Sequence, residues 1–252
     1  MRSMRSSGSH LADKCTEQRT QVENMQQIAH RGVHRNQPEN SLAAFAASVE
    51  LGIFAVETDL RLAADGQIVL FHDRFVGDRS VESLTRAELS QAIGYPVPTL
   101  PEALGAFPQI EWILELKTPE VLDPALSVAG PFVGTHKLML ISFWHTIIVE
   151  AAESTNIDLG FAFGNSSLGV LEAAGAARDR HPCINTIVWN YEFLDAEMLQ
   201  QAQTNSWRNL VFNTRSAADD LQCRALHLDG VITDRPSEAK SFGDSPTARG
   251  RP

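Results

Sequence analysis

Cysteine is scarce in this chain of 252 residues, which contains only Cys15, Cys183 and Cys223. An odd, widely spaced set is no disulfide framework, and without a Cys-x-x-Cys pair nothing indicates a zinc site built from thiolates. Scattered thiols of this kind are typical of a protein in a reducing compartment. Hydrophobic residues make up 43% of the chain, which is enough for a sizeable core.

Long apolar runs are also missing, and no segment approaches the roughly 20 residues that a membrane-spanning helix needs. The first residues, MRSMRSSGSH, are basic, but no apolar stretch follows them, so they do not form a secretory signal. We therefore expect a cytoplasmic protein with no stable membrane insertion. Residues 1–24 and 239–252 are small and polar, and we expect two flexible tails around one domain at 25–238.

Positively charged residues are fewer than negatively charged ones: the chain has 21 Lys and Arg residues and 31 Asp and Glu residues, for a net charge of -10. An acidic surface repels nucleic acids and anionic membranes, which favours a small-molecule partner. Any anionic phosphate group must then meet a local positive charge or a metal ion. The oligomeric state is left open by the sequence.

Short β-rich runs alternate with helical patterns along the whole domain. Eight strands that alternate with helices indicate a parallel sheet, and their number favours a closed (β/α)₈ TIM barrel in the α/β class. The expected strands are 25–30, 53–59, 110–116, 138–142, 157–163, 184–189, 209–213 and 230–233.

One further apolar run, residues 67–71, follows the turn signal Asp65-Gly66 and predicts a small hairpin outside the barrel count. Asn40 is predicted to cap a helix that ends before Gly52. Other helices are expected to begin near Thr99, Asp123, Trp144, Ser166, Leu194 and Ser216.

Charged residues collect where the predicted strands end. Residues two apart on a strand point to the same face, so Glu57 shares a face with Asp59, and Glu115 shares one with Lys117. Active sites of such barrels lie at the C-terminal ends of the strands. Three carboxylates that converge there need a cation, and an all-oxygen set suits Mg²⁺ or Ca²⁺.

Each of these features also has an ordinary structural interpretation. Glu57 and Asp59 could face solvent, Glu115 and Lys117 could form a surface ion pair, and a histidine such as His72 is often structural. Their joint position at the ends of independently predicted strands, with His30-Arg31 at the end of the first, favours a site instead.

Five separated motifs resemble the glycerophosphodiester phosphodiesterase family, in its compact bacterial type. The resemblance extends in order from residue 28 to residue 236. The motifs are IAHRGVHRNQPENSLAAF (28–45), VETDLRLAADGQIVLFHD (56–73), VPTLPEAL (97–104), ILELK (113–117) and DGVITDRP (229–236).

The resemblance implies a metal-dependent enzyme on a TIM barrel that hydrolyses glycerophosphodiesters to glycerol 3-phosphate and an alcohol. Attack by the glycerol 2-hydroxyl would form a cyclic phosphate that water then opens. Family precedent favours His30 as acid and His72 as base, although the sequence alone leaves their order open. The implied residues are Glu57, Asp59 and Glu115 for one divalent cation, Mg²⁺ or Ca²⁺, His30 and His72 for catalysis, Arg31 and Lys117 for the phosphate, and Asn40 near the first loop.

The sequence departs from the family pattern at two places. The family usually has a Trp-Thr-Val-Asn run on its seventh strand, and this sequence has VFNT (211–214) there. Phe212 replaces the aromatic residue of the pocket wall, Asn213 replaces the threonine and Thr214 replaces the valine. Ala64 stands where a threonine is common. Neither change removes an expected catalytic residue, but both leave the preferred head group open.

Two other functions fit the same features. A phospholipase of the sphingomyelinase D type shares the fold and the histidine pair, but it needs an exposed apolar rim to meet a membrane. The loops at 35–40 and 165–167 are polar, which argues against it. The other is a barrel that binds phosphate esters without turnover, which the intact His30 and His72 disfavour.

Overall fold

The computed structural model describes residues 25–165, 167 and 169–237. The two expected tails and the helix start expected at Ser166 lie outside the described residues.

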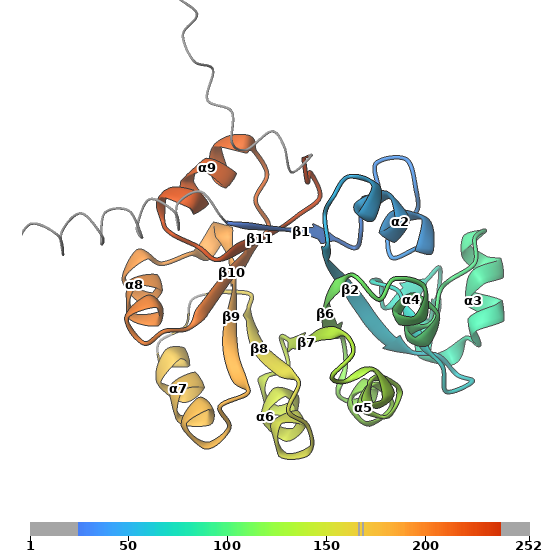
Figure 1. Cartoon of the computed structure of the whole chain (residues 1–252). Coiled ribbons are helices and arrows are strands. Elements are labelled where there is room, and N and C mark those ends of the chain that lie inside the picture. The colour runs from blue at the N-terminus through green and yellow to red at the C-terminus, as the bar shows by residue number, and fades with distance from the viewer. Residues whose placement is uncertain (1–24, 166, 168, 238–252) are drawn as a thin grey trace, which may run out of the picture.

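Eight parallel strands of the described chain form a closed barrel, as predicted (Figure 1). Each strand pairs in parallel with the next, and β1 pairs with both β2 and β11, which closes the ring. The barrel strands are β1 (Gln26–His30), β2 (Ala55–Leu62), β6 (Glu111–Leu116), β7 (Lys137–Ser142), β8 (Asp158–Phe163), β9 (Ile184–Asn190), β10 (Arg208–Phe212) and β11 (Gly230–Thr233).

The barrel is filled by side chains rather than hollow. Branched and long apolar residues such as Ile28, Ile113, Met139 and Val188 form one buried cluster inside the ring. A larger cluster lies between the outer face of the strands and the helices. Strands buried on both faces need continuous apolar sequences, which is why the strand positions can be read from the sequence.

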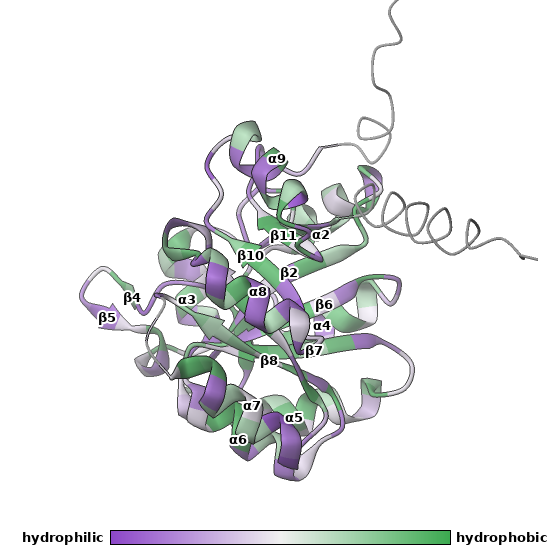
Figure 2. Cartoon of the chain, turned by 90° about the vertical axis from the view of Figure 1, so that its left-hand side faces the viewer, coloured by the Kyte–Doolittle hydropathy of each residue, from purple (hydrophilic) through white to green (hydrophobic). Residues whose placement is uncertain are grey.

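Helices surround the barrel and carry both hydrophilic and hydrophobic residues, as expected where one face is buried (Figure 2). They are α2 (Leu42–Glu50), α3 (Arg86–Ile93), α4 (Leu100–Ala106), α5 (Leu122–Ala129), α6 (His145–Ser154), α7 (Val170–Arg180), α8 (Ala196–Thr204) and α9 (Ala217–Ala225), with short 3₁₀ turns at Val81–Ser83, Pro119–Val121, Gly130–Phe132 and Tyr191–Phe193. None of these described helices is long and apolar enough to cross a membrane.

The prediction that Asn40 caps the first of these helices is wrong by one residue. The side chain of Ser41 accepts the capping hydrogen bond from the backbone N–H of Ala44. Asn40 is instead turned into the barrel, where it is 1% exposed and bound to residues of β2. Gly52 follows the C-cap Leu51 with a left-handed φ of 76°, as expected.

The predicted hairpin is confirmed, because β3 (Ile68–Leu70) pairs antiparallel with β2. Behind it lies a unit that the sequence did not indicate, made of the short hairpin β4 (Phe75–Val76) and β5 (Arg79–Ser80) followed by α3. Val81, Leu84 and Leu89 give this unit a small core of its own. The N–H of Val81 donates to the carbonyl of Arg74 at 3.0 Å, which ties this unit to the loop that begins at His72.

Candidate active site

The predicted site residues lie together at the C-terminal end of the barrel. In the strand register His30 lies beside Glu57, and Asp59 lies beside Glu115. Neighbouring strands are about 4.8 Å apart, so these pairings bring the side chains within reach of one another. Lys117 directly follows β6, and His72 follows β3, the partner of β2.

Three carboxylates form a tight, buried cluster, and their ligand oxygens all lie within 4.8 Å of one another. Glu57 is 2% exposed, Asp59 0% and Glu115 9%. Both carboxylate oxygens of Glu57 lack a hydrogen-bond partner, and Oδ1 of Asp59 is held by its ion pair with Lys117. Such groups are costly to bury unpaired, so the cluster has the composition of a site for a hard divalent cation.

The electrostatics of the cluster agree with this interpretation. Burial, together with the carboxylates of Asp59 and Glu115, raises the pKa of Glu57 well above its ordinary value. Burial also raises the pKa of Glu115. Burial would raise the pKa of Asp59 as well, but the charges of Lys117 and Arg31 outweigh it and lower that pKa.

Two cations balance part of this negative charge. The Lys117 ammonium lies 2.7 Å from Oε1 of Glu115 and 3.1 Å from Oδ1 of Asp59. Arg31 Nε lies 3.2 Å from Oδ2 of Asp59, at ion-pair distance but without the alignment of a hydrogen bond. Two positive groups against three carboxylates leave negative charge for a metal ion to neutralise.

The loop after β1 is held in a strained shape that serves this cluster. Arg31 and Asn40 both adopt left-handed backbone conformations, with φ of 55° and 51°, and the N–H of Asn40 donates to the carbonyl of Arg31. Residues other than glycine rarely adopt this left-handed backbone conformation, and such strain is common at functional sites. Between the two, Gly32 packs so closely on Ala44 that a Cβ would lie 2.8 Å from its carbonyl carbon.

Asn40 orients Asp59, a role that the sequence did not reveal. Its amide donates to Oδ2 of Asp59 at 2.8 Å, and its Oδ1 accepts from the Thr58 hydroxyl at 2.6 Å. The PEN motif pointed to Asn40 as a polar residue near the loop. Nothing local in the sequence could show that its partner lies 19 positions further along the chain.

His30 and His72 both line a cavity of about 510 Å³ over the carboxylate cluster, together with Arg31, Glu57, Glu115 and Lys117. Nε2 of His30 lies 3.8 Å from Oε2 of Glu57. Nδ1 of His72 contacts Oδ1 of Asp73 at 2.8 Å. The guanidinium of Arg61 donates two hydrogen bonds, of 2.9 and 2.8 Å, to the carbonyl of His72 and so fixes its backbone.

Apolar side chains also line this cavity. Phe212 is one of them, and its ring contacts Phe143 edge-on with centroids 5.7 Å apart, while its role as a pocket wall stays a prediction. Phe143 is 43% exposed and Trp144 is 52% exposed. The rim is therefore less polar than the loops at 35–40 and 165–167 suggested.

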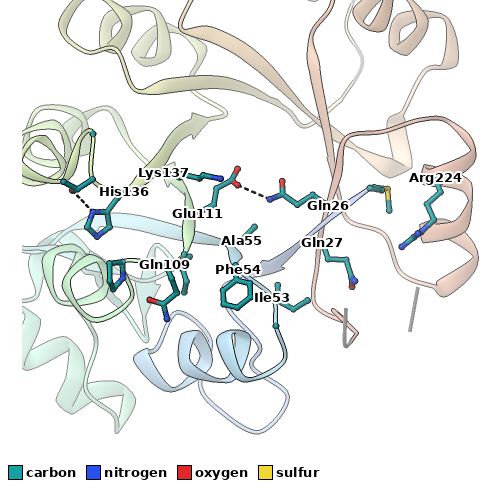
Figure 3. Close-up of a pocket in the computed structure, with 16 residues that line it drawn as sticks. Gln26, Gln27, Ile53, Phe54, Ala55, Gln109, Glu111, His136, Lys137 and Arg224 are labelled. Atoms are coloured by element: carbon teal, nitrogen blue, oxygen red, sulfur yellow. Dashed lines mark hydrogen bonds between the residues drawn. The ribbon is translucent and has the colours of Figure 1, made fainter. Parts of the chain in front are cut away.

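A larger cavity of about 700 Å³ opens at the other end of the barrel, among the first residues of β1, β2, β6 and β7. None of the predicted site residues lines it. Figure 3 shows Gln26 and Glu111 pointing toward one another there, joined by a hydrogen bond of 3.1 Å. Gln26 and Glu111 thus satisfy each other, whereas the oxygens of Glu57 in the carboxylate cluster have no hydrogen-bond partner.

Comparisons with known proteins point to one family. The model of the glycerophosphoryl diester phosphodiesterase family matches residues 30–137, which include all three carboxylates and both histidines. A glycerophosphodiester phosphodiesterase of Caldanaerobacter subterraneus is 24% identical over 235 residues, covering 83% of this chain and 93% of that protein.

Solved structures match along nearly the whole described chain. An Oleispira antarctica phosphodiesterase, solved with the product sn-glycerol-3-phosphate, gives a TM-score of 0.77 at 25% identity, covering 87% of this chain and 97% of that one. A Thermotoga maritima glycerophosphodiester phosphodiesterase gives 0.73 at 24% identity, covering 84% and 95%. The family model and these relatives together support the glycerophosphoryl diester phosphodiesterase family for this chain.

Proposed function

We propose that this protein hydrolyses glycerophosphodiesters to glycerol 3-phosphate and an alcohol, with His30 and His72 as its acid/base pair. One observation carries the proposal: two imidazoles and two cations line a single cavity against a buried carboxylate cluster with unpaired oxygens. The match to the family model and the product named for the Oleispira relative support it.

Glu57, Asp59 and Glu115 fit one divalent cation, Mg²⁺ or Ca²⁺, because they offer oxygen ligands close together and the nearby cations do not balance their charge. A cation held there would neutralise negative charge that develops on the phosphoryl group. The remaining chemistry belongs to the side chains of this chain.

In the first step His72 acts as base and takes the proton of the glycerol 2-hydroxyl while its oxygen attacks phosphorus. The bond from phosphorus to the alcohol oxygen breaks, and His30 gives that oxygen a proton, so a cyclic phosphate and a free alcohol result. In the second step the protonated His72 and the neutral His30 exchange roles while water opens the ring. Two histidines suit this exchange because imidazole titrates near neutral pH.

Arg31 and Lys117 are proposed to contact the phosphate. Both line the cavity, and both are held by acidic residues, Lys117 by Asp59 at 3.1 Å and Arg31 by Glu39 at 2.8 Å. Phe212 is proposed as the wall against which the substrate packs. The partner is a small molecule, and the cytoplasmic location stays a prediction from the sequence.

The test is to incubate the protein with mixed glycerophosphodiesters, with and without a chelator, and to assay glycerol 3-phosphate. We expect product that disappears on chelation and returns with Mg²⁺ or Ca²⁺. Product analysis also separates the alternatives. Cyclic phosphate from a lysolipid would indicate the sphingomyelinase D type, and binding without any product would indicate a barrel with no turnover.

A further inference from the structure

Each proposed catalytic histidine has a carboxylate on Nδ1, but the two carboxylates come from different places. Asp73 is the chain neighbour of His72. The partner of His30 is Asp234, which lies 204 positions away and directly after β11, with Oδ1 at 2.5 Å from Nδ1. The motif DGVITDRP contains Asp234, but no sequence pattern ties it to His30.

This contact fixes which nitrogen of His30 carries the proton. The hydrogen bond from His30 holds the pKa of the Asp234 carboxyl below its ordinary value, so this group is ionised near neutral pH. An ionised carboxylate only accepts hydrogen bonds, hence Nδ1 of His30 is the donor. Nε2 is left on the side of the ring that faces Glu57, at 3.8 Å from Oε2.

The barrel holds Asp234 in place for this contact. Strands β11 and β1 are neighbours, with Thr233 beside Ala29 in register, so Asp234 and His30 extend from adjacent strand ends. The backbone after Asp234 is fixed by a hydrogen bond from the N–H of Arg235 to the Thr233 hydroxyl, at 3.2 Å. The Asp234 side chain itself is 59% exposed, so it adds little to the core.

We propose that Asp234 is a positioning residue for His30, which sets its tautomer and ring orientation so that Nε2 faces the scissile phosphodiester. Its catalytic meaning rests on the proposed function. A carboxylate in this place also stabilises the imidazolium that forms whenever His30 holds a proton during the reaction. The neighbours that face Asp234 are His34, whose Nε2 lies 3.8 Å away, and the guanidinium of Arg31.

The experiment compares Asp234→Ala with the wild type by nitrogen NMR of the imidazoles and by steady-state kinetics. At a pH where His30 is neutral, the wild type should show a single tautomer with the proton on Nδ1, and Asp234→Ala should show a mixture. We expect kcat to fall about 10–100-fold, with KM nearly unchanged. This is the range seen when a metal-ligating histidine loses the partner that orients its ring. Asp234→Asn keeps an acceptor without the charge and should lie between the two.

A nitrophenyl ester, which needs no proton on departure, should shrink the kcat defect if His30 is the acid. His34→Ala is the matched control, because His34 also faces Asp234 but does not line the cavity, and it should keep wild-type turnover and the His30 tautomer. An unchanged tautomer and kcat in Asp234→Ala would overturn the proposal, and so would a loss confined to thermal stability. A changed tautomer in a protein that releases no glycerol 3-phosphate would contradict the proposed function instead.

Discussion

Strand β6 carries a glutamate toward each end of the barrel, and the two differ in their surroundings. Glu111 begins the strand and is fully paired, accepting from Gln26 at 3.1 Å and from Arg208 at 3.0 Å. Glu115, four residues later, lies against two further buried carboxylates, one of which has no hydrogen-bond partner at either oxygen. Buried polar groups that hydrogen-bond to one another stabilise a fold, whereas buried polar groups without a partner indicate a ligand site. One strand thus carries a paired, structural carboxylate at its start and a proposed metal ligand near its end.

The largest expected difference between the two ends is in turnover. His30→Ala and His72→Ala should each lower kcat about 10²–10⁴-fold, because each removes a proton-transfer group. His136 lines the cavity at the other end and serves as the matched histidine, so His136→Ala should leave kcat within about twofold of wild type. Steady-state assays of glycerol 3-phosphate release measure all three.

The two histidine variants can also be distinguished by their turnover of substrates with different leaving groups. A nitrophenyl ester should rescue the variant that lacks the acid far more than the one that lacks the base. The double variant should lose less than the product of the single losses, since both groups act on one transition state. Near-normal turnover in either single variant would make that histidine structural and contradict the mechanism.

The next effect concerns two buried asparagines. Asn40→Ala removes the amide that orients Asp59 and should weaken binding of Mg²⁺ or Ca²⁺ about 10–100-fold. Asn209, 1% exposed and bonded to the indole N–H of Trp189 at 2.9 Å, is its matched partner in the barrel. Asn209→Ala should reduce stability but leave cation affinity unchanged. Calorimetric titration with the cation decides between them, and equal affinity losses in both would remove the special role of Asn40.

A smaller effect is expected on thermal stability without added cation, which Glu57→Gln and Glu111→Gln should change in opposite directions. Folding raises the pKa of Glu57 above its ordinary value of 4.5, so the folded protein binds more protons than the unfolded chain between the two values. The contribution of Glu57 to the free energy of unfolding is therefore fully present below pH 4.5. It is lost as the pH rises through the pKa that Glu57 has in the folded protein. Glu57→Gln should raise the melting temperature at neutral pH in chelator.

Glu111→Gln should do the reverse, because it removes the charge that Arg208 pairs with, at a cost of about 0.5–1.5 kcal/mol. Thermal melts of both variants beside the wild type, at pH 4.5 and at neutral pH, give the measurement. The gain from Glu57→Gln should vanish at the lower pH. A fall in melting temperature for Glu57→Gln at neutral pH would show that this carboxylate is stabilising rather than unpaired.

The barrel could be predicted from the sequence because its strands are buried on both faces and stand out as apolar runs. All eight barrel strands and the extra hairpin lie within about three residues of the predicted ranges, and the largest difference is at the end of β2. α3 was missed although Thr85 and Glu88 form a capping box at its start, because its exposed, polar sequence carries little hydrophobic periodicity. The short pair β4 and β5 is too brief for any pattern to indicate it.

The proposed site could be predicted in part, for a related reason. Glu57, Asp59, Glu115 and His30 lie at the ends of the predicted apolar strands, so the barrel rule brings them to one face. His72 follows the hairpin strand β3, which the Asp65-Gly66 turn signal predicts. The residues that orient them could not be found this way. Asn40, Arg61 and Asp234 act through contacts across loops or between the two ends of the chain, and side-chain contacts over such separations leave no local trace.

The most direct test of the account is a structure determined with Ca²⁺ or Mg²⁺ bound. We predict one ion at the C-terminal end of the barrel, coordinated by oxygens of Glu57, Asp59 and Glu115 at about 2.0–2.6 Å. We also predict no ion at Glu111, whose oxygens are already paired. An ion held elsewhere, or one that leaves any of these three carboxylates uncoordinated, would contradict the claim that unpaired acids at this end mark the site.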